Sequence, residues 1–100
     1  MIVIAGEVKI RPEAREAAVQ AGQRMMTATR AEAGCRVYRF SFDFADPALV
    51  YIFEEWESEE ALTRHFQTPH MAEFQKAMPS FLAAPPSVRR YAVASVSQMM

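Results

Sequence analysis

The residues of this chain that are best suited to chemistry lie in one stretch, residues 54–70, which reads EEWESEEALTRHFQTPH. This stretch holds the only tryptophan, both histidines and five glutamates. An imidazole has an ordinary pKa of about 6.5, so a histidine in an apolar pocket is well matched to accept a proton at neutral pH. The alternative interpretation is a strand that runs into a well-capped helix and carries its histidines for structural reasons.

His65 is the candidate base of this stretch. The spacing predicts a helix after Ser58, and the apolar stripe of that helix consists of Ala61, Leu62, His65 and Phe66. The ring of His65 is therefore expected to point inward. Inward histidines often serve as core residues with a hydrogen-bond partner. A catalytic base and a structural core histidine both remain open.

A metal site is not expected. His65 and His70 are five residues apart, which places them off the same face of a helix. No third ligand suggests itself. Cys35 is the only cysteine, so it forms no disulfide within the chain and no cysteine cluster, and it is expected to be a small buried residue.

Further candidates would contact a substrate from the strands and from the helices that follow. Trp56 is favoured as a core anchor, with stacking on a flat substrate as the catalytic alternative. Glu54 and Arg39 are predicted to form an ion pair across a hairpin, which would place polar contacts at the floor of a cleft. His70 is expected at the cleft mouth. The remaining wall residues are expected to be Phe66, Met71, Phe74 and Phe81.

The elements that must position these residues follow from the pattern along the chain. Residues 2–10 are rich in β-branched side chains and predict a strand. Apolar residues three and four apart predict a helix over 13–33, with Pro12 in its first turn and Gly34 at its end.

Residues 35–44 and 49–57 predict the two strands of a hairpin, with ADPA as the turn between them. An even loop centred between Asp46 and Pro47 would give the cross-strand pairs Arg39–Glu54, Val37–Trp56, Phe40–Phe53 and Phe42–Tyr51. This register would place the aromatic side chains on one face of the hairpin, which consists of Tyr38, Phe40, Phe42, Tyr51 and Phe53.

Two short helices are predicted next, with Ser58 and Thr68 as their N-caps. The first is expected to end near Gln67 and the second near Met78, with a kink or restart at Pro79. The last strand is predicted over 87–96. Residues 1–98 are expected to be ordered, and 99–100 to be a frayed tail.

This order predicts an α+β domain of the ferredoxin-like class, with an antiparallel four-stranded sheet and helices on one face. The whole chain, 1–100, is expected to form one domain. The strands show no clean polar face, so the sheet face without helices needs a cover. The simplest cover is a second copy of the chain, and the aromatic face of the hairpin is the preferred interface of this homodimer.

Composition excludes several classes of partner. The net charge is −1 and the basic residues are scattered, so neither nucleic acid nor an anionic membrane is an expected partner. The first apolar run, MIVIAG, is too short for a signal peptide or a spanning helix. We therefore expect a cytoplasmic protein.

Three segments carry a family resemblance: EAGCRVYRF, DPALVYIFEEWESEEALTRHFQTPHMAEF and the closing VRRY. Together they resemble the antibiotic biosynthesis monooxygenase domain, a family of dimeric α+β barrels that includes quinol monooxygenases. The resemblance covers nearly the whole chain. It implies oxidation of an anthrone or aromatic diol by O₂ without a cofactor, with His65 and Trp56 as the catalytic residues.

A base such as His65 suits the reaction that the resemblance implies. The hydroxyl of a hydroquinone or naphthol has a pKa of about 10, so its ionisation at neutral pH costs about 4 kcal/mol. The resulting anion passes an electron to O₂ more readily than the neutral phenol does. A base and a dry pocket are therefore sufficient in principle for oxidation by O₂ without a cofactor.

Two alternatives remain beside this hypothesis. One is a non-catalytic ligand-binding or stress-associated dimer in which His65 is structural. The other is haem breakdown, since some members of the family degrade haem. Those members use an asparagine on the first strand, and this chain contains no asparagine, so haem breakdown is the minor alternative.

Overall fold

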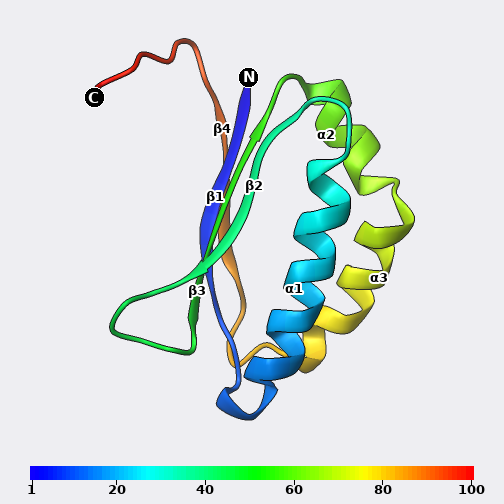
Figure 1. Cartoon of the computed structure of the whole chain (residues 1–100), viewed down its shortest axis with the longest axis vertical. Helices are drawn as coiled ribbons and strands as arrows, with labels where there is room; N and C mark the ends of the chain where they lie inside the picture. Colours follow the sequence, from blue (N-terminus) through cyan, green and yellow to red (C-terminus); the bar gives the residue numbers. More distant parts are fainter.

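Four strands and three helices follow one another in the order that the sequence predicts (Figure 1). The computed structural model describes all residues, 1–100. The elements are β1 (Ile2–Lys9), α1 (Arg15–Arg30), β2 (Cys35–Phe42), β3 (Leu49–Trp56), α2 (Glu59–Phe66), α3 (Pro69–Ala77) and β4 (Ser87–Ala92). Short 3₁₀ turns lie at Pro12–Ala14, before α1, and at Met78–Ser80, after α3.

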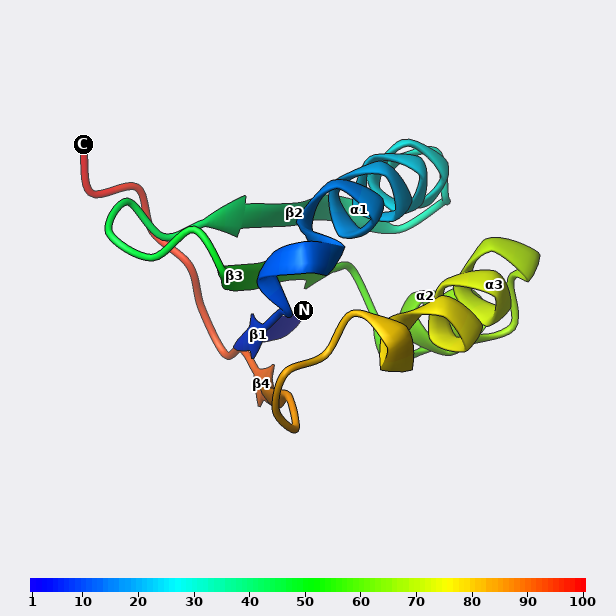
Figure 2. The ribbon, with the colours of Figure 1, turned by 90° about the horizontal axis from the view of Figure 1, so that it is seen from below.

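The strands form one antiparallel sheet in the order β2-β3-β1-β4, which is the ferredoxin-like arrangement. All three helices cover the same face of this sheet, and the other face carries no helix (Figure 2). The predicted fold class is therefore confirmed. None of the helices combines the length and the apolar composition that a membrane span requires.

The helix boundaries follow from local side-chain chemistry. The hydroxyl of Ser58 accepts a hydrogen bond from the backbone N–H of Ala61 at 3.2 Å, and the hydroxyl of Thr68 accepts one from Met71 at 3.3 Å. The break between α2 and α3 thus lies where the two N-caps predict it. Gly34 has a φ of +86°, and a Cβ there would lie 2.5 Å from the Cβ of Ala61, so only glycine fits.

The predicted hairpin register is wrong by one residue. Tyr38 lies opposite Glu54, and Phe40 lies opposite Ile52. The connecting loop is centred on Asp46 and not between Asp46 and Pro47, since the N–H of Asp43 donates to the Leu49 carbonyl at 3.0 Å. Within this loop the Asp43 carboxylate accepts hydrogen bonds from the N–H groups of Ala45 and Asp46 at 2.9 and 3.1 Å. This turn shifts the pairing.

A shift of one residue moves side chains to the opposite face of a sheet. Tyr38, Phe40 and Phe42 therefore face the helices, whereas Tyr51 and Phe53 lie on the face without helices, so the single aromatic face does not exist. The predicted ion pair is also wrong. Arg39 lies opposite Phe53 and is exposed, while Glu54 is buried on the helix side.

The core lies between the sheet and the helices, at the end where β3 leads into α2. Its buried members are Ile2, Met25, Tyr38, Trp56, Ala61 and Leu62. Trp56 has no exposed surface, as its interpretation as a core anchor requires. The remaining space between the layers, toward the start of α1, is less completely filled.

Candidate functional site

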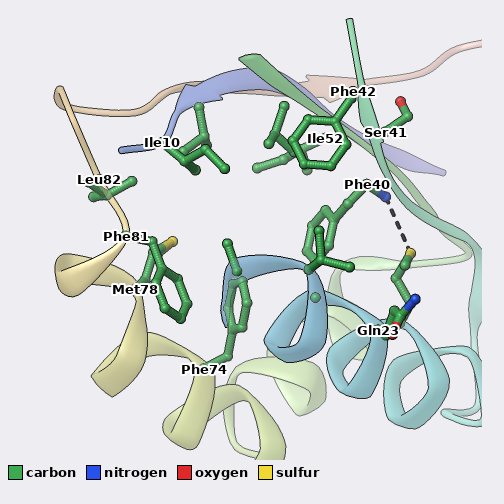
Figure 3. A pocket seen from close by; sticks show the side chains of 16 residues that line it. Ile10, Gln23, Phe40, Ser41, Phe42, Ile52, Phe74, Met78, Phe81 and Leu82 are labelled. Atoms are coloured by element: carbon green, nitrogen blue, oxygen red, sulfur yellow. Dashed lines mark hydrogen bonds between the residues drawn. The ribbon is translucent and has the colours of Figure 1, made fainter. Parts of the chain in front are cut away.

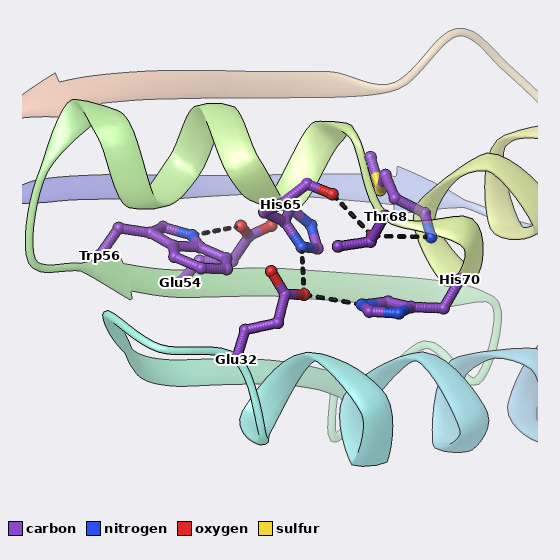
Figure 4. A network of polar contacts seen from close by, with 7 residues as sticks. Glu32, Glu54, Trp56, His65, Thr68 and His70 are labelled. Carbon is purple, nitrogen blue, oxygen red and sulfur yellow. Dashed lines mark hydrogen bonds and ion pairs between the residues drawn. The ribbon is translucent and has the colours of Figure 1, made fainter.

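Two histidines and one glutamate meet at the buried end of this interlayer space (Figure 4). His65 Nδ1 lies 2.8 Å from Glu32 Oε2, and His70 Nε2 lies 2.7 Å from the same oxygen. The side chains of His65, Glu32 and His70 are 2%, 13% and 26% exposed. We call these three residues the histidine cluster.

The cluster forms at two helix ends: α1 ends just before Glu32, and α2 ends between His65 and His70. His65 is in the last turn of α2 and His70 in the first turn of α3, so their five-residue spacing crosses a helix break instead of running along one helix. The same-face argument, which assumed one continuous helix, therefore does not apply to this pair, and Glu32 is a third residue beside them. Glu32 follows the end of α1, just before Gly34 turns the chain into β2.

No sequence motif predicts Glu32 as a site residue, although its position after a helix is a signal. A carboxylate just beyond the C-terminus of a helix is opposed by the negative end of the helix dipole. Such a residue requires a compensating partner elsewhere in the fold. Here the two imidazole N–H groups supply it.

The shared oxygen fixes the tautomers of neutral histidines. A carboxylate only accepts hydrogen bonds, so His65 must carry its proton on Nδ1 and His70 must carry its proton on Nε2. Nε2 of His65 and Nδ1 of His70 then hold the lone pairs. Glu32 thus orients the ring of His65 and leaves Nε2 as its proton acceptor.

A second polar pair lies beside the cluster. Trp56 Nε1 donates a hydrogen bond to Glu54 Oε1 at 2.9 Å. Burial raises the pKa of the Glu54 carboxyl to about 7; the hydrogen bond from Trp56 lowers this pKa, and the negative charge of Glu32 raises it. Near neutral pH, Glu54 is therefore divided between its protonated and ionised forms.

Cys35 is not equipped to act as a nucleophile. Burial, with the charges of Glu32 and Glu54, raises the pKa of its thiol to about 11. The thiolate is the reactive form, and it is scarce at neutral pH.

An apolar cavity of about 250 Å³ lies at the other end of the interlayer space (Figure 3). None of its lining residues has a titratable side chain, and Gln23 and Ser41 are the polar ones. The full lining consists of Val8, Ile10, Ala18, Val19, Gly22, Gln23, Met26, Phe40, Ser41, Phe42, Val50, Ile52, Phe74, Met78, Phe81 and Leu82. A cavity of about 150 Å³ already admits benzene, so this one has room for a small aromatic molecule.

Aromatic rings separate the cavity from the histidine cluster. Phe40 and Phe74 stack at a centroid distance of 5.7 Å with their planes 15° apart, and both line the cavity. Tyr38 lies behind Phe40 at 5.2 Å, and the ring of His65 lies 5.5 Å from Tyr38. His65 is therefore close to the cavity but is not part of its wall.

The predicted site residues divide into three groups. Phe74 and Phe81 line the apolar cavity. His65, His70, Glu54 and Trp56 lie in the polar region, and Met71 packs against the core.

The third group consists of Arg39, which lies away from both regions, and Phe66, which borders the polar region with its ring 5.7 Å from that of His65. Arg39 points to the opposite sheet face because of the register shift. Phe66 was expected on the inward stripe of α2 but is 51% exposed, because it lies at the edge of that stripe.

A surface groove of about 240 Å³ gives the histidine cluster contact with solvent. It lies between α1 and α3, and its lining includes Arg24, His70, Glu73 and Phe74. Phe74 also lines the apolar cavity, so this one ring stands between the groove and the cavity.

Comparisons with known proteins agree with this architecture. The sequence profile of the family described as antibiotic biosynthesis monooxygenase matches residues 1–77. The Mycobacterium tuberculosis protein named "Putative monooxygenase Rv0793" is 36% identical over 78% of this chain and 76% of that protein. Its solved structure superposes with a TM-score of 0.87 over 97% of this chain and 98% of that chain.

Two further relatives extend this result. The Escherichia coli protein named "Probable quinol monooxygenase YgiN" is 28% identical over 78% of this chain and 85% of that protein. A solved structure from Deinococcus radiodurans has a TM-score of 0.90 over 100% of this chain and 99% of that chain; at 23% identity it supports the fold alone. The family and the names of these relatives support a monooxygenase-type function. On the profile match and the identity to its relatives, this chain belongs to the antibiotic biosynthesis monooxygenase family.

Proposed function

We propose that this protein oxidises an electron-rich aromatic hydroxyl compound, such as a quinol or an anthrone, with O₂ and without a cofactor. The observation that carries the proposal is the position of the apolar cavity, two ring layers from a buried imidazole that Glu32 orients. The cavity would hold the flat, uncharged part of the substrate. His65 would receive the hydroxyl proton on Nε2.

For an anthrone, the reaction balances without an external reductant; a quinol would instead give two electrons and two protons to O₂, which yields a quinone and H₂O₂. When the hydroxyl form of an anthrone gives its proton to His65, the anion that remains is the species that donates electrons to O₂. Conversion of the CH₂ group to a carbonyl releases four electrons, which reduce both atoms of one O₂. One oxygen atom remains in the product, and the other leaves as water with the two hydrogens of the CH₂ group.

The stacked pair of Phe40 and Phe74 would act as the gate in this scheme. A substrate in the cavity reaches His65 only if these rings separate, since they close the end of the cavity that faces Tyr38. Rotation of side chains is a common way to admit a substrate and then exclude water. Phe74 would be the moving ring, because the apolar cavity lies on one of its sides and the surface groove on the other.

Trp56 and Glu54 would position His65. The ring of Trp56 lies 4.7 Å from that of His65, and its N–H is engaged by Glu54. Both side chains are buried, so in the closed arrangement they are positioning residues that hold the imidazole in place.

An oxygen-electrode assay with chelator-treated protein tests the proposal. A panel of anthrones, naphthalene diols and hydroquinones would be supplied, and O₂ uptake compared with buffer. General-base catalysis contributes about 10²–10⁴-fold, so His65→Ala should lower the rate by at least about 100-fold. Arg64→Ala, on the exposed side of the same helix, is the matched control and should keep full activity. Oxidation no faster than in buffer, or unchanged by His65→Ala, would contradict the proposal.

A non-catalytic ligand-binding protein is the second candidate, and one observation favours it. No titratable side chain lines the apolar cavity, so a bound molecule meets no acid or base there while the gate is closed. This function requires only burial of apolar surface. It predicts saturable binding of 1-naphthol to the cavity, with no O₂ uptake above buffer and no effect of His65→Ala on affinity.

We further propose that two copies of the chain pair through the sheet face without helices, here called the open face. Its apolar side chains, assigned from the strand pairing, are Val3, Ala5, Val37, Leu49, Tyr51, Phe53 and Tyr91. Tyr51 and Tyr91 are 40% and 46% exposed, which is costly for a free surface. Charges of both signs, including Arg39 and Glu55, lie on the same face and suit a self-complementary contact.

Light scattering tests the dimer. The wild-type protein should have twice the chain mass of 11.3 kDa. Phe53→Asp should give the single-chain mass, because it places a charge in the middle of the open face. Phe66→Asp, an equally drastic change on the exposed side of α2, should leave the dimer intact. A wild-type protein of single-chain mass would contradict this assignment.

A further inference from the structure

We propose that the histidine cluster binds one divalent transition-metal ion, of the type of Zn²⁺ or Co²⁺. The two nitrogens and the oxygen that point toward one another lie within 4.8 Å of each other. Two imidazoles and one carboxylate form a donor set that is typical of such ions in proteins. This inference goes beyond the proposed function and does not depend on it.

The geometry requires movements of the three side chains. Zn–N and Zn–O bonds of about 2.0–2.1 Å in a tetrahedral site place neighbouring ligand atoms about 3.3 Å apart. In the cluster the contacts from Glu32 Oε2 are 2.8 Å to His65 and 2.7 Å to His70, and the two ring nitrogens lie within 4.8 Å of each other. An ion therefore fits if the two contacts of Glu32 lengthen by roughly half an ångström and the two imidazoles approach each other by up to about 1.5 Å.

The protons can be accommodated without ionising a histidine ring. Each imidazole presents an N–H to Glu32, and a metal requires a lone pair at that position. A shift of the proton to the other ring nitrogen supplies this lone pair on both His65 and His70. The single negative charge of Glu32 then partly neutralises the cation.

The surroundings provide entry and an open coordination position. His70 is 26% exposed and lines the groove between α1 and α3, whereas His65 is fully enclosed. An ion can approach from the groove, bind His70 first and reach the two deeper ligands. Three protein ligands beside a solvent-accessible groove leave the fourth position for water.

Metal binding and base catalysis require different protonation arrangements of His65, so they exclude each other. With a metal on Nδ1, the proton of the ring lies on Nε2, so this nitrogen no longer accepts a proton. The metal-free protein is therefore the form to which the proposed oxidation applies. Because the two states differ, binding must be measured by a signal other than oxidation.

Titration of chelator-treated wild-type protein with Co²⁺ tests the inference. We expect visible absorption bands of four-coordinate Co²⁺ that saturate at one equivalent, and their displacement by Zn²⁺. His65 and His70 are the only histidines in the chain, so no other imidazole site competes. Zn²⁺ that binds the native state should also raise the melting temperature.

Variants locate the ion. His70→Ala and Glu32→Gln should each weaken Co²⁺ binding by at least about 100-fold, since even changes to residues behind a metal ligand cost 10–100-fold. Glu73→Gln is the matched control, because Glu73 lines the same groove without belonging to the cluster. Circular dichroism would verify that each variant is folded.

The Co²⁺ titration and the oxidation assay test the metal site and the proposed function separately. Absence of saturable Co²⁺ binding to the wild type, or binding that His70→Ala leaves unchanged, would overturn the metal site and leave only a hydrogen-bonded triad. Neither result affects the oxidation assay on metal-free protein. A failure of that assay in turn leaves the absorption titration intact.

Discussion

At the end of the interlayer space where β3 enters α2, Trp56 is fully buried and His65 is 1% exposed, whereas at the other end a cavity of about 250 Å³ remains between the layers. The first region holds the buried titratable groups and their hydrogen bonds. The second holds apolar side chains without a single titratable group. The stacked rings of Phe40 and Phe74 form the boundary.

The tightly packed residues and the space for a ligand are thus at opposite ends of the same layer. Buried polar groups are tolerated only when they are paired, and pairing requires close contact, which leaves no room for a guest. An apolar cavity needs no such pairing and can remain open. The oxidation proposed above would therefore depend on movement of the boundary rings.

The largest expected effect comes from breaking the packed region. Trp56→Ala removes a fully buried ring and leaves Glu54 without its hydrogen-bond donor, so it should lower the free energy of unfolding by about 3–5 kcal/mol. Urea denaturation measures this loss. The control is Phe66→Ala, which removes a half-exposed ring and should cost about 0.5 kcal/mol or less. Equal costs for the two variants would show that the packed region is not the core.

The next effect concerns the pH dependence of stability. The pKa of Glu54 is raised from 4.5 to about 7 on folding, so between these values the native state binds more protons than the unfolded state. The contribution of Glu54 to the free energy of unfolding is therefore fully present below pH 4.5 and is lost as the pH rises through 7. One pKa unit corresponds to 1.36 kcal/mol, so the loss is on the order of 3 kcal/mol.

The Glu54→Gln variant isolates this contribution, because it keeps an oxygen for the Trp56 N–H and cannot ionise. Urea denaturation of both proteins at pH 4.5 and pH 8 gives the comparison. The wild type should lose more stability than the variant over this interval. Parallel pH profiles would mean that Glu54 titrates normally in the native protein.

A smaller difference should distinguish the two histidines of the cluster. His65→Ala should lower the free energy of unfolding by about 1–3 kcal/mol, since a buried hydrogen bond to Glu32 is lost. His70→Ala should cost about 1 kcal/mol or less, because that ring is partly solvated. The double variant would measure how strongly the two rings are coupled through Glu32. A larger loss of stability for His70→Ala than for His65→Ala would contradict the structure, in which His65 is the more buried of the two.

The smallest effect tests whether the boundary can move. A Cβ at Gly22, in the middle of α1, would lie 3.2 Å from Cδ2 of Phe40. Gly→Ala inside a helix stabilises by about 0.5–1 kcal/mol, provided that Phe40 shifts into the cavity. Gly22→Ala should therefore be neutral or slightly stabilising and should weaken 1-naphthol binding, measured by fluorescence titration. A destabilisation above about 1 kcal/mol would show that Phe40 is rigid, so that the proposed gate could open only by movement of Phe74.

Local signals allowed the elements to be predicted. The caps at Ser58 and Thr68 predicted where α2 and α3 begin, whereas α1 ends at Arg30, three residues before the helix end that Gly34 predicted. These features depend on residues only a few positions apart. The element order then selected the ferredoxin-like sheet, since few topologies satisfy it.

The register of the hairpin could not be predicted in the same way. It depends on how the Asp43 carboxylate closes the loop, and a change of one residue there exchanges the two faces. The error moved Arg39 to the wrong side of the sheet and divided the aromatic residues between two faces. The inward direction of His65, by contrast, followed from helical periodicity alone.

The sequence by itself thus determined the elements, their order and the inward turn of one imidazole, because each is encoded over one or two turns of chain. Only the tertiary structure brought Glu32 to His65 and His70, across 33 and 38 positions, and left the cavity on the far side of Phe40. Contacts between distant segments depend on how the helices and the sheet pack together. No pattern within a single segment records that packing.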